Sequence, residues 1–234
     1  MRERIEPVGI PSLHRGEEVK KQQVRERILS VGVIPVIRAT SARHAMAGIE
    51  AICEGGIPIA EITMTVPGAI SLIEEVAKRM GPSVLVGAGT VLDASTARQC
   101  ADAGAQFLVS PGFDLATVEF ARGKEVLMMA GALTPTEVIA VWKSGADFVK
   151  VFPCGEVGGA KYIRALRGPF PQIPMVPTGG VSLKTAAEFI RAGASALGVG
   201  GELVSAAALE SGDARTISDN ARAFVAAVQE ARTS

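Results

Sequence analysis

The stretch EVLMMAGALTPTEVIAVWKSGADFVKVF, residues 125–152, contains two apolar runs separated by a helical pattern. The runs EVLMMA (125–130) and FVKVF (148–152) are almost continuously apolar, which is typical of parallel strands covered on both faces. Between them, TPTEVIAVWKSGA places Thr134 where a helix N-cap is expected and Gly145 just past the last apolar turn. A strand, a helix and a second strand of this kind predict a right-handed βαβ crossover.

Six further apolar runs extend this unit over most of the chain. They are VIPVI (33–37), IAEIT (59–63), VLVGA (84–88), FLVS (107–110), MVPT (175–178) and ALGVG (196–200). Helical patterns such as SARHAMAGIEAICEGG and SLKTAAEFIRAGA stand between them. Eight strands alternating with helices predict an α/β fold, a closed (β/α)8 TIM barrel. An open, doubly wound sheet is the alternative that strand counting leaves open.

The two ends of the chain differ in character. Residues 1–21 are polar, carry Pro7 and Pro11, and are predicted to be a flexible N-terminal tail. The pattern VRERILSVG (24–32) then predicts a short helix before the first strand. The short spacing between later units leaves no room for large insertions, so we predict a single barrel domain over residues 22–234.

Capping residues predict where individual helices begin and end. The predicted N-caps are Ser41, Asp93, Thr134 and Ser182. Glycines just past the last apolar turn of four helices predict left-handed C-terminal caps, at Gly55, Gly104, Gly145 and Gly193.

Composition excludes several classes of function. The 234 residues are 48% hydrophobic, and 24 basic side chains balance 24 acidic ones. A zero net charge offers no field that attracts nucleic acid or a membrane surface, so an anionic ligand must be held by local chemistry. Cys53, Cys100 and Cys154 form neither a disulfide framework nor a CxxC motif, and no secretory signal or long apolar span is evident. We therefore expect a cytoplasmic protein.

Three candidate functional residues are charged side chains within, or directly after, apolar predicted strands. Lys150 lies within DFVKVFP, and a desolvated lysine is the nucleophile that condenses with a ketone. A lysine at a strand end with its ammonium in water, or an ion-paired core lysine, explains the pattern equally well. Glu61 in IAEIT is a buried carboxylate suited to proton transfer, or a structural partner of a nearby cation. Arg38, at the end of VIPVIR, is suited to clamping a substrate carboxylate or to pairing with Glu61.

Glycines at strand exits predict where a ligand approaches the backbone. Thr90 follows two glycines in GAGTV, although a simple turn explains this motif as well. Gly179 and Gly180 follow the seventh predicted strand, and Gly200 and Gly201 follow the eighth. Loops after these two strands of a barrel commonly hold phosphate through backbone N–H groups. The only histidines, His14 and His44, lie far apart, so we expect no metal site and no cofactor.

Several long segments in order resemble the 2-keto-3-deoxy-6-phosphogluconate (KDPG) and 2-keto-4-hydroxyglutarate (KHG) aldolase family. They include GVIPVIRA, EGGIPIAEITMTVPGA, VGAGTVL, AGAQFLVSPG, AGALTPTE, VKVFP, GPFPQIPMVPTGGVS and GVGGELV. The resemblance runs from about Ile28 to the C-terminal helix.

The resemblance implies a class I aldolase in which Lys150 forms an imine with the keto acid and Glu61 is the general acid/base. It implies that Thr90, Pro111 and Phe152 line the pyruvyl pocket, and that the two glycine pairs bind phosphate. It also implies a carbon–carbon lyase of the Entner–Doudoroff pathway that assembles as a homotrimer.

The chain departs from the family at three places, one of which is Ala130, where the family has the proline of PGALTPTE. Some members carry an arginine where this chain has Thr65, so Arg38 is expected to supply the missing cation. Some members carry a serine in the last phosphate loop, whereas this chain reads Gly201–Glu202, and we expect Glu202 to point away from a phosphate.

The expected reaction is cleavage of KDPG to pyruvate and glyceraldehyde 3-phosphate. KHG is an additional candidate substrate, and the epimeric phosphogalactonate is an alternative. A phosphosugar epimerase or isomerase and a non-catalytic phosphate-binding barrel are the rivals from other classes. Lack of a pyruvate-dependent adduct favours either rival.

Overall fold

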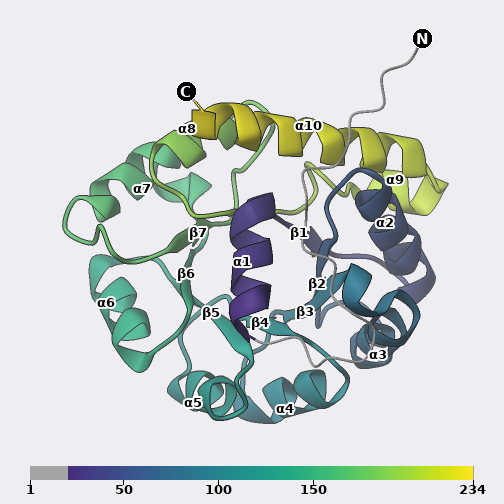
Figure 1. Ribbon diagram of the computed structural model, residues 1–234, viewed down its shortest axis with the longest axis horizontal. Helices are drawn as coiled ribbons and strands as arrows, with labels where there is room; N and C mark the ends of the chain where they lie inside the picture. The colour runs from purple at the N-terminus through teal and green to yellow at the C-terminus, as the bar shows by residue number, and fades with distance from the viewer. Residues whose placement is uncertain (1–20, 234) are drawn as a thin grey trace.

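The computed structural model describes residues 21–233, in which eight parallel strands form a barrel surrounded by helices (Figure 1). The strands are β1 (Val33–Ile37), β2 (Ile59–Thr63), β3 (Leu85–Gly89), β4 (Phe107–Val109), β5 (Leu127–Ala132), β6 (Phe148–Val151), β7 (Met175–Pro177) and β8 (Leu197–Val199). Strands pair in the order β7-β6-β5-β4-β3-β2-β1-β8, and a bridge from Thr178 to Gly198 closes the ring. The predicted (β/α)8 barrel is confirmed, and the open doubly wound sheet is excluded.

Helices follow the strands and form the outer layer of Figure 1. They are α2 (Ala42–Glu54), α3 (Ala69–Met80), α4 (Ala94–Asp102), α5 (Leu115–Gly123), α6 (Pro135–Ser144), α7 (Ala160–Arg167), α8 (Ala186–Arg191), α9 (Ala206–Ser211) and α10 (Ala214–Thr233). Two 3₁₀ helices, η1 (Gly81–Ser83) and η2 (Gly155–Val157), lie before β3 and after β6. Among residues 21–233, no helix combines the length and the apolar composition that crossing a bilayer requires.

Helix α1 (Lys21–Val31) covers the N-terminal end of the barrel, where Figure 1 shows it crossing the opening. Its buried side chains are Val24, Ile28 and Val31. Lys21 forms a 2.9 Å ion pair with Asp147, which immediately precedes β6. The helix before the first strand is thus confirmed, and it already includes Lys21; residues 1–20 of the predicted tail lie outside the described residues. Helix α1 itself does not cover the opposite, C-terminal end of the strands.

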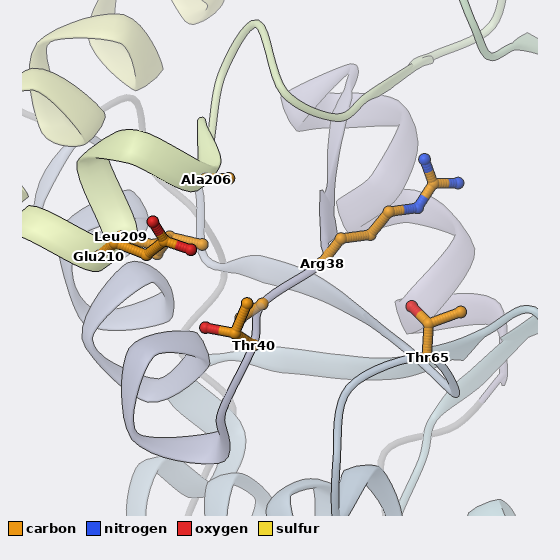
Figure 2. A pocket seen from close by; sticks show the side chains of 7 residues that line it. Arg38, Thr40, Thr65, Ala206, Leu209 and Glu210 are labelled. Atoms are coloured by element: carbon orange, nitrogen blue, oxygen red, sulfur yellow. The ribbon is translucent and has the colours of Figure 1, made fainter.

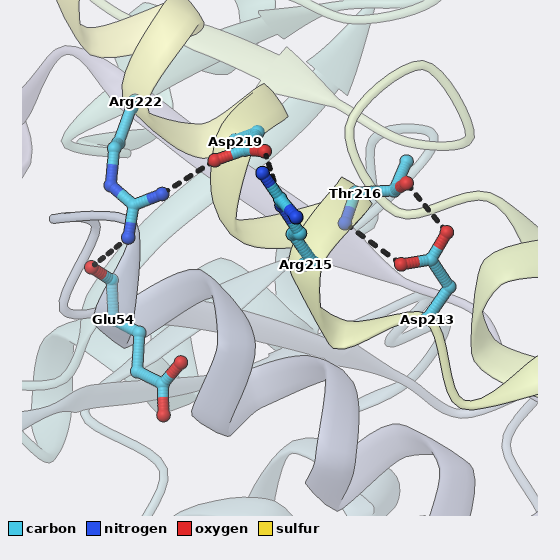
Figure 3. Close-up of polar contacts among 6 residues, drawn as sticks. All are labelled: Glu54, Asp213, Arg215, Thr216, Asp219 and Arg222. Atoms are coloured by element: carbon cyan, nitrogen blue, oxygen red, sulfur yellow. Dashed lines mark hydrogen bonds and ion pairs between the residues drawn. The ribbon is translucent and has the colours of Figure 1, made fainter.

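Helix α10 closes the ring by packing on α2 and α8. Figure 3 shows how its first turns are held: Asp213 accepts hydrogen bonds from the backbone N–H and the hydroxyl of Thr216, at 3.0 and 2.6 Å. Farther along, Arg222 donates to Asp219 and to the carbonyl oxygen of Glu54 at the end of α2. These contacts tie the last helix to the first βα unit.

Most predicted caps are confirmed, and two are wrong. Ser41, Asp93 and Thr134 each accept a hydrogen bond from a backbone N–H in the first turn of their helix. Ser182 is not an N-cap, because its N–H donates to the hydroxyl of Thr185 in a turn and α8 begins only at Ala186.

Three of the four predicted left-handed glycines are confirmed, since Gly104, Gly145 and Gly193 have φ of 100°, 87° and 97°. The prediction of a left-handed Gly55 is wrong, because its φ is −78° and the left-handed residue is Gly56, with φ of 92°. Gly55 has a packing role, since a Cβ there would overlap Ala221 of α10.

Candidate active site

Lys150 and Glu61 meet inside the barrel. Lys150 on β6 is in register with Gly131 on β5, and Glu61 on β2 is in register with Gly87 on β3. Strands β2 and β6 lie on opposite sides of the ring, yet Lys150 Nζ is 3.8 Å from Glu61 Oε1. Only 5% of Lys150 and 3% of Glu61 is exposed. The structure therefore brings together the two residues predicted to be catalytic, in a buried ion pair.

The Glu61 carboxylate lies in an environment that shifts its pKa. Oε1 of Glu61 accepts no hydrogen bond from any described residue. Burial raises the pKa of Glu61, because it disfavours the charged form, whereas the charges of Lys150 and Arg38 lower that pKa. A buried carboxylate whose pKa lies above its usual range, beside an amine, is an arrangement typical of active sites.

The glycines of the GAG motif make room for protein side chains. A Cβ on Gly89 would overlap the Glu61 carboxylate, and a Cβ on Gly87 would overlap the ring of Phe107. The sequence had suggested that these glycines let a ligand approach the backbone. Their role in the described structure is to admit Glu61 and Phe107 into the barrel interior.

Pro111 and Phe152 both lie next to Lys150. Lys150 Nζ stands 5.4 Å from the centroid of the Phe152 ring, within the range of a cation–π contact. A Cβ on Gly131, the β5 partner of Lys150, would overlap the backbone of Pro111. Both residues therefore lie at the wall around the amine.

Thr90 directly follows β3 and has a left-handed backbone, with φ of 60°. This conformation is unfavourable for a β-branched residue, and such strain is concentrated at functional sites. The Thr90 side chain is half-buried at the C-terminal end of β3.

Arg38 lies at the rim, one residue past the end of β1. Because Val36 is in register with Glu61, Arg38 projects from the same face of the sheet, nearer the C-terminal end. Arg38 lines a cavity of about 210 Å³ between the first two loops and α9, which is also lined by Ala39, Thr40, Thr65, Ala206, Leu209 and Glu210. Figure 2 shows its guanidinium directed away from Glu210. Arg38 forms no direct ion pair with Glu61, so the predicted alternative of such a pair is wrong.

The two glycine pairs lie on neighbouring strand exits, as the bridge between Thr178 and Gly198 requires. Gly179 and Gly180 have φ of 86° and 74°, and the carbonyl oxygen of Gly179 accepts from Gly155 N at 2.9 Å. Within residues 21–233, the N–H groups of Gly180 and Gly201 donate to no protein acceptor. Free N–H groups at two adjacent exits are suited to an anion. Glu202 is exposed.

Two buried hydroxyls at strand ends escaped the sequence reasoning. Ser110 donates to the carbonyl oxygen of Gly112 at 2.6 Å and fixes the turn that carries Pro111. Thr178 is 6% exposed, and its hydroxyl lies over Gly198, where a Cβ would collide with it. Ser110 and Thr178 are polar residues at the ends of apolar strands, and the same feature identified Arg38 in the sequence.

No group of three or more histidine, cysteine or acidic side chains among the described residues is arranged to hold a metal ion. Similarity to known proteins identifies the family of the chain. Residues 24–220 match the family model for KDPG and KHG aldolase. The chain belongs to the KDPG and KHG aldolase family. Aldolases of this family are carbon–carbon lyases that act on small keto acids, and the enzyme class of the chain follows.

Individual members of the family are similar over nearly their full length. The KHG/KDPG aldolase of Escherichia coli strain K12 is 36% identical over 202 residues, covering 86% of this chain and 94% of that protein. The KDPG aldolase of Legionella pneumophila, solved with pyruvate captured at low pH as a covalent carbinolamine, aligns with a TM-score of 0.79 and 28% identity. That alignment covers 86% of this chain and 97% of the other. A native KDPGal structure aligns with a TM-score of 0.80 and 28% identity, covering 86% and 96%.

Proposed function

We propose that the protein is a class I aldolase in which Lys150 forms an imine with the C2 carbonyl of a 2-keto acid. The observation that carries this proposal is the buried pair of Lys150 and Glu61, 3.8 Å apart inside the barrel. An amine that must lose a proton before it attacks a ketone needs a base within reach, and Glu61 is that base.

Each step of the proposed reaction uses a group at this site. Lys150 Nζ attacks C2 to give a carbinolamine, and loss of water gives a protonated imine. This cation accepts the electron pair of the C3–C4 bond as the bond breaks, which yields an enamine. Glu61 takes the proton of the C4 hydroxyl and releases the aldehyde. Protonation at C3 and hydrolysis of the imine then release pyruvate and restore Lys150.

Substrate binding divides between two ends of the site. We assign the keto-acid carboxylate to Arg38 and Thr90, because Arg38 is a cation, unpaired among the described residues, on the strand next to Glu61 and Thr90 follows β3, the strand on the other side of Glu61. We assign a distal phosphate to the free N–H groups of the glycine pairs. The proposed reaction is thus cleavage of KDPG to pyruvate and glyceraldehyde 3-phosphate, with KHG cleavage to pyruvate and glyoxylate as a second activity.

Two features of the proposal rest on resemblance alone. The epimeric phosphogalactonate substrate is supported by the likeness to the KDPGal structure, and comparing kcat/KM for the two epimers decides between them. The homotrimer implied by the family remains a prediction that light scattering tests.

Replacing Lys150 by methionine tests the catalytic amine. We expect Lys150→Met to lower kcat by at least about a thousandfold, because the covalent pathway is lost, while circular dichroism shows a folded barrel. Lys143→Met, in an exposed position on α6, is the matched control and should keep full activity. Retained turnover in Lys150→Met would reject the assignment.

A further inference from the structure

Among residues 21–233, two charged groups act on Glu61, one inside the barrel and one at its rim. From β6 the Lys150 amine approaches Oε1 to 3.8 Å, and from β1 Arg38 stands one pleat nearer the rim on the same interior face. The other neighbouring strand, β3, presents Gly87 and Gly89 to Glu61 and therefore carries no charge there. On β2 itself, the next interior residue is Thr63, whose hydroxyl donates to the carbonyl oxygen of Ile37 at 2.9 Å.

The two cations differ in how firmly they are held. Lys150 is buried, and its nitrogen carries a positive charge both as the ammonium of the free protein and as the protonated imine of the proposed reaction. Arg38 is exposed and has no ion pair or hydrogen bond with any described residue. Its charge lowers the pKa of Glu61, in addition to the larger effect of Lys150. A bound carboxylate would neutralise that charge and add a negative charge near Glu61.

We propose that Arg38 couples binding of the keto-acid carboxylate to the proton affinity of Glu61, so that substrate itself converts Glu61 into a stronger base. In the free protein, the charge of Arg38 adds to that of Lys150 in lowering the Glu61 pKa against the opposing effect of burial. When the carboxylate pairs with Arg38, Glu61 loses this stabilisation and binds a proton more readily, at the moment when the proton must leave carbon or oxygen. Arg38 thereby has two roles: it binds the substrate carboxylate, and its charge sets the proton affinity of Glu61. This coupling rests on the proposed function.

Exchange of the pyruvate methyl protons for solvent deuterium measures the coupling with the full-length protein. The reaction passes through imine and enamine without an aldehyde, and pyruvate has no group that titrates near neutral pH. Proton NMR gives kcat and kcat/KM for exchange as functions of pD. The fall of kcat/KM at low pD, its acidic limb, reports the protonation of Glu61 in the free protein. The fall of kcat at low pD reports the protonation of Glu61 in the complex with pyruvate.

The expected result is an acidic limb that lies at higher pD in kcat than in kcat/KM. Arg38→Met should move the kcat/KM limb to higher pD and lower kcat/KM by about 10- to 100-fold, the loss expected for a charged hydrogen bond. Arg38→Lys keeps the charge and should leave the limb in place, with weaker binding because the bidentate contact is lost. Arg43→Met, exposed on α2, is the control and should change neither limb.

Coincident limbs in the unmodified protein, or an Arg38→Met limb that does not move, would overturn the coupling while leaving the imine mechanism intact. Absence of any exchange by a folded protein would instead overturn the proposed function, and the coupling with it. Glu61→Gln identifies the titrating group, since its residual exchange should lack the acidic limb. A limb that persists in Glu61→Gln contradicts the role given to Glu61.

Discussion

Thr90 and Glu125 are the two described non-glycine residues with a left-handed backbone, at φ of 60° and 56°. They differ in place, because Thr90 ends a strand at the proposed catalytic end of the barrel and Glu125 precedes β5 at the opposite end. Each conformation disfavours a side chain, and each is relieved by glycine. Comparing Thr90 with Glu125 therefore distinguishes backbone strain at the proposed site from backbone strain in a turn far from it.

Thr90→Gly and Glu125→Gly should therefore have similar effects on stability and different effects on activity. We expect each to leave the free energy of unfolding unchanged or to raise it by about 1 kcal/mol, since relieved strain offsets the added freedom of the unfolded chain. Thr90→Gly should lower kcat/KM about tenfold or more through the lost carboxylate contact. Urea unfolding and steady-state kinetics measure both quantities. Full activity in Thr90→Gly would remove Thr90 from the binding site.

At this scale the sequence predicted much of the site, because a charge in an apolar strand is visible without coordinates. Lys150, Glu61 and Arg38 were found in this way, and Ser110 and Thr178 carried the same signal. The role of Gly89 was not predictable, since its necessity arises from the Glu61 carboxylate on the neighbouring strand. Likewise, the register that brings Lys150 across the barrel to Glu61 exists only once the ring closes.

The loops after β6 and β7 act as one element. A Cβ on Gly180 would lie 2.7 Å from Gly155 Cα, and Cys154 and Gly155 donate to the carbonyl oxygens of Thr178 and Gly179. Positions of the free N–H groups therefore depend on contact between two loops that are well separated in sequence. Helix ends were predicted less well where such contacts decide them, as at Gly55, which packs on α10.

Gly180→Ala should push these loops apart. We expect the change to weaken phosphate binding and to leave imine formation with pyruvate nearly unaffected. The new Cβ meets Gly155 and sits on a backbone with φ of 74°. We expect KM for a phosphorylated substrate to rise about tenfold, the loss of one hydrogen bond to a charged group, while pyruvate methyl exchange changes by less than about threefold. Gly168→Ala, on helical backbone at the end of α7, is the control and should change neither. Equal losses in both assays would argue against a separate phosphate site.

For the molecule as a whole, the barrel followed from counting eight strands, whereas its closure and the place of α1 required long-range packing. Helix α1 contacts the starts of strands, through Asp147 before β6 and the carbonyl oxygen of Pro82 before β3. It therefore closes the end of the barrel opposite to the site. The sequence of α1 predicts a helix but does not indicate which part of the barrel it packs against.

Truncation tests how much the fold depends on α1. A chain that begins at Lys21 is the reference for this test. A chain that begins at Gly32 loses Val24, Ile28 and Val31 from the core, and each buried side chain contributes about 1.5–3 kcal/mol. We expect its Tm to fall by on the order of 10 °C or more, as calorimetry would show. An unchanged Tm would mean that α1 does not support the barrel.

Borohydride reduction in the presence of pyruvate, followed by peptide mass spectrometry, detects the proposed imine directly. We expect a reduced pyruvyl adduct on Lys150, and none on the exposed lysines such as Lys143. A folded protein that forms no adduct, or forms it on a different lysine, would contradict the imine mechanism proposed for the Lys150–Glu61 pair.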